Sequence, residues 1–182
     1  MSAVCVEKIF NGRKIRIREL SKEDLKKPKD FLNYINSLVA EDAKILINKK
    51  FTLKQEKEWL KSVFEGIKRK KKVFCIAEHQ NKIVGIGGIE MKNYRENHVG
   101  LVGISVRKGY RGIGLGKYLM KTVIDLAKRR LKVRIIRLSV FENNKIAINL
   151  YKKLGFKKVA KIPKQIQYKN KLIDEIVMIL EV

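Results

Sequence analysis

The fold is decided by the stretch GLVGISVRKGYRGIGLGK, which runs from Gly100 to Lys117. Its apolar run, Leu101 to Val106, is typical of a strand, and it ends in a glycine-rich loop. Apolar residues then recur at helical spacing, at Leu115, Leu119, Val123, Leu126 and Ala127. A glycine-rich turn that leads into a helix leaves unpaired N–H groups at the positive end of the helix dipole. The stretch therefore predicts a phosphate-binding site, to which Arg111 and Lys117 add full positive charges.

Three phosphate-binding patterns can be compared with this loop. The P-loop pattern fails because Arg111 stands where its first glycine belongs, and Tyr118 follows Lys117 in place of Ser or Thr. The dinucleotide pattern fails because Gly112, Gly114 and Gly116 are spaced G-x-G-x-G, and no acidic residue closes the next strand. The third pattern, R-x-x-G-x-G, fits as Arg111, Gly114 and Gly116.

A second motif follows one helix and one strand later. The pattern N-x-x-A-x-x-L-Y-x-x-x-G-F is made by Asn144, Ala147, Leu150, Tyr151, Gly155 and Phe156. It predicts a helix that is capped near Asn143 or Asn144 and ends at Gly155 in a left-handed conformation. With both motifs in this order, the chain resembles the GNAT superfamily of acyl-CoA-dependent N-acetyltransferases. The motifs are nearest to those of ribosomal-protein and protein N-terminal acetyltransferases, and the resemblance covers residues 73–182 well.

Periodicity and turn residues place the remaining elements. A polar helix entry begins at Ser21 and is broken by Pro28, and Thr52 with Gln55 forms the capping-box pattern of a later helix, whose Trp59 is expected in the core. Strands are expected at 14–19, 73–78, 83–90, 98–106, 133–141, 156–162 and 172–180, and helices at 30–38, 52–67, 115–127 and 144–154. This order, β-α-α-β-β-β-α-β-α-β-β, is the one that the resemblance implies. The expected fold is α/β (α+β), with a mixed, mostly antiparallel sheet of about seven strands and about four helices.

Composition indicates a globular chain. With 182 residues and 45% hydrophobic content, we expect one domain over residues 1–182. The sequence has no apolar run long enough to cross a membrane and no signal-peptide pattern, so a cytoplasmic location is expected. Cys5 and Cys75 are too few for a disulfide framework and are expected to be reduced. The two cysteines and two histidines show no ligand spacing, so no metal site is expected.

The formal charge of +25 requires its own interpretation. A basic surface attracts polyanions such as nucleic acid, ribosomes and CoA. The alternative is a lysine-rich composition spread over solvated faces, which is the commoner meaning of charge runs such as 68–72 and 128–130.

The resemblance implies roles for particular residues. Backbone groups of Ile104, Ser105 and Val106 would bind the pantetheine arm of acetyl-CoA. Asn144 would also bond pantetheine, although it could instead serve only as a helix cap. Tyr151 would donate a proton to the leaving thiolate, or it could be a core aromatic residue. The diphosphate would lie on the loop formed by Arg111, Gly112, Ile113, Gly114, Leu115, Gly116 and Lys117.

The motifs do not identify the general base of the predicted site. Relatives that acetylate protein N-termini often carry a glutamate twelve residues before the tyrosine, where this chain has Ser139. Glu142 is the leading substitute, with Glu90, His98 or a water relay as alternatives. Acids in the segments that flank the acceptor pocket of the family could instead bind an ammonium group, and they are Glu41, Asp42, Asp174 and Glu175.

The sequence therefore predicts an N-acetyltransferase that transfers acetyl from acetyl-CoA directly to a primary amine in a ternary complex. The acceptor is expected to be a protein N-terminal or lysine amine, with an amino acid or a polyamine as alternatives. A second hypothesis is a basic nucleic-acid or ribosome-binding module on the same scaffold, although the sequence has no RNA-binding signature. A membrane partner is not expected, and the chain could be a monomer or a homodimer.

Overall fold

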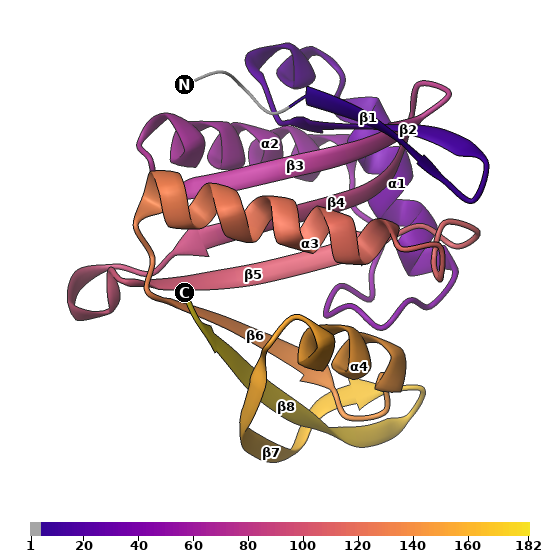
Figure 1. Cartoon of the computed structure of the whole chain (residues 1–182). Coiled ribbons are helices and arrows are strands. Elements are labelled where there is room, and N and C mark those ends of the chain that lie inside the picture. The colour runs from indigo at the N-terminus through magenta and orange to yellow at the C-terminus, as the bar shows by residue number, and fades with distance from the viewer. Residues whose placement is uncertain (1–4) are drawn as a thin grey trace.

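The computed structural model describes residues 5–182, which build one mostly antiparallel sheet with helices on both faces (Figure 1). Among these described residues the sheet has eight strands in the order β1-β2-β3-β4-β5-β6-β8-β7, and only β5 and β6 pair in parallel. The strands are β1 (Cys5–Phe10), β2 (Arg13–Glu19), β3 (Lys72–His79), β4 (Lys82–Met91), β5 (Val99–Val106), β6 (Ile135–Phe141), β7 (Lys157–Tyr168) and β8 (Lys171–Glu181). The helices are α1 (Pro28–Ala40), α2 (Leu53–Lys68), α3 (Leu115–Leu126) and α4 (Lys145–Lys153). The expected α/β class, the antiparallel character and the helix order are confirmed.

The expected strand count of about seven is one too low, because β1 precedes the first predicted strand. Its side chains are mostly exposed, so it lacks the strict apolar alternation that marks a half-buried strand. A signal for it exists in Asn11 and Gly12, which both have positive φ and join β1 to β2 as an Asn-Gly hairpin turn.

Two apolar clusters cover opposite faces of the sheet. One includes Phe31, Tyr34 and Leu38 of α1 with Leu60 and Val63 of α2. The other cluster joins α3 and α4 to the opposite face of the sheet and includes Leu115, Leu119, Met120, Val123 and Tyr151. Because α3 and α4 share one face, the glycine-rich loop and the Asn144 helix lie on the same side of the molecule (Figure 1). Within residues 5–182, no helix combines the length and hydropathy needed to cross a bilayer.

The segment before α1 corrects one expectation. Pro28 does not break a helix; it begins α1, where the missing N–H of proline costs nothing. The polar residues before it form a separate short 3₁₀ helix, Lys22–Lys26. The Thr52–Gln55 capping box at the start of α2 is confirmed, with Thr52 Oγ1 accepting from the Gln55 amide at 3.3 Å.

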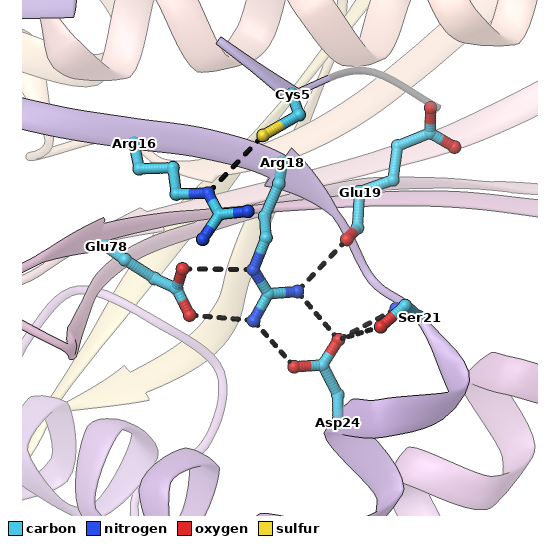
Figure 2. A network of polar contacts seen from close by, with 7 residues as sticks. All are labelled: Cys5, Arg16, Arg18, Glu19, Ser21, Asp24 and Glu78. Atoms are coloured by element: carbon cyan, nitrogen blue, oxygen red, sulfur yellow. Dashed lines mark hydrogen bonds and ion pairs between the residues drawn. The ribbon is translucent and has the colours of Figure 1, made fainter. Parts of the chain in front are cut away.

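A polar network fixes this short helix to the sheet (Figure 2). Arg18 of β2 donates two hydrogen bonds to Asp24 at 2.8 Å each, and two to Glu78 of β3 at 2.7 and 3.0 Å. Burial opposes ionisation of Asp24, but the bonds from Arg18 and Ser21 outweigh it, so the pKa of Asp24 is lowered. The network therefore holds a buried charge pair that orients the chain entering α1.

Candidate active site

The groove that could hold a cofactor starts where β5 and β6 separate. These parallel strands pair only at Val99–Leu101 with Ile135–Arg137. Beyond this point β5 stays paired with β4 as far as Val106, while its other edge has no strand partner among residues 5–182. The opening is a groove of about 1320 Å³, lined by β5, β6, α4, the glycine-rich loop and the segment after α1. An unpaired strand edge offers N–H and C=O groups to an extended ligand.

The glycine-rich loop closes one end of this groove. Gly114 is the N-cap of α3 with φ of 89°, no side chain in the described part of the chain caps the helix, and its first turn holds no acidic residue. Within residues 5–182, the six amides from Gly112 to Lys117 have no hydrogen-bond acceptor. A Cβ at Gly112 or Gly114 would meet no atom of residues 5–182 within 4 Å, so this part of the chain leaves the space beside the loop open. These unpaired amides at the positive end of α3 could hold an anion.

Arg111 joins this loop to the segment after α1. Its Nε donates to the Val106 carbonyl at 2.7 Å, and its guanidinium makes an ion pair with the carboxylate of Glu41. Glu41 is 15% exposed, so the pair is partly shielded from water. Arg111 therefore positions the loop, while Lys117 remains the loop cation with no ion-pair partner among residues 5–182.

The side chain of Ser105 on β5 is held by a helix of the opposite face. Its hydroxyl lies 2.9 Å from the hydroxyl of Tyr34, a side chain that is 1% exposed. Burial raises the pKa of Tyr34, so its phenol stays protonated. This contact fixes β5 against α1 at the point where the strand lines the groove.

The helix α4 brings two predicted residues to the groove. Asn144 is its N-cap, and its Oδ1 accepts from the Ala147 amide at 3.3 Å, as the capping alternative expects. The amide NH₂ of Asn144 makes no hydrogen bond within the described residues. Tyr151 lines the groove at 8% exposure, and burial raises the pKa of its phenol to about 12. Gly155 ends the helix with φ of 93°, as predicted.

A smaller chamber of about 300 Å³ lies at the β6–β8 end of the groove. The segment after α1 forms one wall, and β6, β7 and β8 form the other. Tyr168 closes it by donating from its hydroxyl to the Asp42 carbonyl at 3.0 Å and by stacking edge-on against Phe141. Most lining side chains are apolar, and the two acids are Asp42 and Glu175.

The structure brings most of the predicted site residues to one groove. The members of the predicted set that line it are Ile104, Ser105, Val106, Arg111, Gly112, Gly114, Gly116, Lys117, Asn144 and Tyr151. Leu115 is fully buried in the core, and Ile113 packs against that core, so their side chains do not line the groove. Glu142 also lies outside it and binds Lys161 at 2.8 Å. Sequence reasoning missed Tyr168 and Arg137 as lining residues, because their contribution depends on where the last strands and β6 pair.

The residues present fit acetyl-CoA. The groove offers unpaired amides for a diphosphate, a strand edge for an extended arm and the protonated phenol of Tyr151 in its lining. Among residues 5–182, no three His, Cys, Asp or Glu side chains are grouped as a metal site would need.

Comparisons with known proteins agree with this geometry. The family model described as the acetyltransferase (GNAT) family matches residues 40–156. A probable N-acetyltransferase camello of Xenopus tropicalis is 35% identical over 85 residues, which cover 47% of this chain and 38% of that protein. An N-alpha-acetyltransferase of Sulfurisphaera tokodaii is 33% identical over 106 residues, which cover 52% of this chain and 62% of that protein. The matches thus span less than two thirds of either relative.

Among solved structures, the ribosomal-protein-S5-alanine acetyltransferase from Vibrio fischeri has a TM-score of 0.82 to this chain at 20% identity. The likeness covers 98% of this chain and 96% of that one. At 20% identity, this likeness shows that the two chains share the arrangement of their strands and helices.

Proposed function

Because the chain belongs to the acetyltransferase (GNAT) family, we propose that it transfers the acetyl group of acetyl-CoA to a primary amine. The observation that carries the proposal is the row of six unpaired amides at the start of α3, which lies at the end of a groove along an unpaired strand edge. A bound diphosphate would satisfy these amides and gain from the helix dipole.

The residues around the groove supply separate contributions to this reaction. The amides of Gly112 to Lys117 hold the diphosphate, and the free edge of β5 at Ile104 to Val106 holds the pantetheine arm. Asn144 caps α4 with its oxygen and offers its amide NH₂ to the same arm. Bound acetyl-CoA supplies the thioester carbonyl that the amine attacks. An amide N–H of β5 that points at this carbonyl oxygen polarises it.

Tyr151 is the proposed general acid. Its pKa of about 12 keeps the phenol protonated at neutral pH, so it can donate to the thiolate as the C–S bond breaks. The transfer is direct. Burial raises the pKa of the Cys75 thiol to about 12, and neither Cys75 nor Cys5 lines the groove. An acyl-cysteine intermediate therefore has no candidate thiol at this site.

The proposed acceptor is the N-terminal amine of a protein. The relative from Sulfurisphaera tokodaii is named as an N-alpha-acetyltransferase, which supports this choice. The chamber beside the groove combines apolar side chains with the carboxylates of Asp42 and Glu175, so it suits one ammonium group on a partly apolar body. Polyamines are disfavoured as acceptors, because cationic side chains outnumber acidic ones in the lining of the groove and would repel them. The cationic side chains are Lys44, Lys92, Arg111, Lys117, Arg137 and Lys153.

An acceptor screen tests the proposal. Thiol release from acetyl-CoA would be followed with peptides that carry free or blocked N-termini, with lysine side-chain amines, with amino acids and with spermidine, and products would be identified by mass. We expect thiol release with free N-terminal peptides and a mass gain of one acetyl group. Thiol release with spermidine alone would contradict the acceptor. Absence of release with every amine, together with salt-dependent RNA binding, would favour a binding module.

A further inference from the structure

We propose that Glu175 is the carboxylate that binds the acceptor's ammonium group and takes its proton. This inference rests on the proposed acetyltransferase function and names the base that the motifs leave open. It starts from three observations, namely the register of β8 on β6, the ion pairs of the neighbouring acids, and the chamber that Glu175 lines.

The strand register places Glu175 beside the position at which the expected glutamate is missing. On the paired strands, Phe141 lies opposite Glu175 and Ser139 lies opposite Val177. Ser139 and Glu175 are therefore diagonal neighbours on the same face of the sheet, with Cα atoms roughly 7 Å apart. A carboxylate on Glu175 reaches the space in front of Ser139 from the adjacent strand.

Among the described acids near this end of the groove, Glu175 is the one whose carboxylate makes no ion pair with a Lys or Arg side chain. Lys161 binds both Glu142 and Asp174 at 2.8 Å, Arg111 binds Glu41, and Lys169 lies 3.4 Å from Asp42. Within residues 5–182, the carboxylate of Glu175 makes no ion pair or hydrogen bond. In a chain with 43 Lys and Arg against 18 Asp and Glu, this half-buried acid remains available for a ligand cation.

Glu175, the proposed base, and Tyr151, the proposed acid, lie on opposite faces of the sheet. Ile176 and Met178 pack into the cluster under α3 and α4, so the alternate residues of β8, Glu175 among them, point to the opposite face. Tyr151 belongs to the α3–α4 side. The two side chains thus line one groove from opposite faces of the sheet, at the place where β5 and β6 separate. An amine entering from the chamber can meet the thioester between them.

The proton balance of this step is complete. The acceptor ammonium gives one proton to the Glu175 carboxylate, and the neutral amine nitrogen forms the N–C bond with the thioester carbonyl carbon. The C–S bond breaks with its electron pair on sulfur, and the thiolate takes the proton of Tyr151. The phenolate regains a proton from the new amide nitrogen, and Glu175 releases its proton to water. The net products are the acetylated amine, the free thiol and one proton.

The test compares the wild type, Glu175→Gln and a matched control, Glu181→Gln, which makes the same change at the exposed far end of β8. The probe is a tetrapeptide with a free N-terminal alanine. Because general bases contribute about 10² to 10⁴-fold, we expect Glu175→Gln to lower kcat/KM by at least about 100-fold. Acetyl-CoA affinity and the melting temperature should stay at the wild-type values, and Glu181→Gln should be fully active. The double variant Glu175→Gln with Ser139→Glu should have a kcat/KM at least about tenfold above that of Glu175→Gln alone, because the new glutamate places a carboxylate in the same space.

A binding measurement separates this inference from a loss of turnover alone. Calorimetry on the CoA-loaded protein would compare the free tetrapeptide with its N-acetylated form. Wild type should prefer the free amine, and Glu175→Gln should lose most of this preference. If Glu175→Gln keeps the preference, or keeps kcat/KM within about threefold, Glu175 is not the base. If the wild-type protein releases no thiol with any amine, the proposed function fails, and the inference fails with it.

Discussion

The Tyr151 phenol stays protonated over the physiological pH range because burial raises its pKa to about 12. We predict that Tyr151→Phe lowers kcat by at least about tenfold, since the thiolate then leaves without an acid, while the affinity for acetyl-CoA is unchanged. Steady-state kinetics and calorimetry would check both parts. Wild-type turnover should also show no alkaline decline from this group below about pH 11. A Tyr151→Phe protein with wild-type kcat would remove the acid role.

Glu56 of α2 is 3% exposed, and burial raises its pKa to about 7. The folded state therefore holds this proton more tightly than the unfolded state, so stability should fall as pH rises from about 4.5 to 7. We predict that Glu56→Gln raises the melting temperature at pH 8 and leaves it nearly unchanged at pH 4.5. At pH 8 the substitution should raise the free energy of unfolding by at most about 3 kcal/mol. Thermal melts of Glu56→Gln and of the exposed control Glu58→Gln would test this, and equal effects of the two substitutions would contradict it.

Single residues differ in how far the sequence reveals them. The place of Tyr151 and of Gly112, Gly114 and Gly116 in one groove could be predicted, because short motifs carry them at fixed spacing, while their roles stay predictions. Glu175 could be named only as one of several acids, because its neighbours depend on the register of β8 on β6. The pairing of Arg111 with Glu41 spans 70 positions and has no local signal in the sequence.

At the scale of elements, the start of α3 is the proposed donor-binding site. Gly116 lies in the first turn of α3, and a Cβ there would make only ordinary contacts, at 3.7 Å to Leu150 and Val106. We predict that Gly116→Asp leaves the fold intact, because an acid suits a helix N-terminus. The same charge would repel the diphosphate and weaken acetyl-CoA binding by at least about tenfold relative to the neutral control Gly116→Asn. Calorimetry on both variants would measure this, and equal affinities would contradict an anion site.

The order of elements could be predicted because each helix and most strands show their own hydrophobic periodicity and are bounded by turn or capping residues. Gly155 and the Thr52–Gln55 capping box have purely local causes, so both predictions are confirmed. The separation of β5 from β6 could not be predicted, because it arises from pairing between segments that are distant in the chain. The strand β1 was missed because its exposed side chains give no burial pattern.

At the scale of the whole molecule, the charge of +25 should act on the rate of donor binding. A cationic surface steers an anion such as acetyl-CoA towards a groove lined by several Lys and Arg side chains. We predict that the association rate falls by about tenfold between 20 mM and 500 mM salt, while the dissociation rate changes much less. Stopped-flow fluorescence would separate the two rates. A salt-independent association rate would show that the excess charge has no part in donor binding.

The central claim is that the amides from Gly112 to Lys117 hold the diphosphate of acetyl-CoA. The most direct measurement is a titration of ¹⁵N-labelled protein with CoA, followed by the backbone amide resonances. We expect the resonances of Gly112, Gly114 and Gly116 to shift most and to saturate together with those of Ile104 to Val106. Saturable CoA binding that leaves the amides of residues 112–117 unchanged would contradict it.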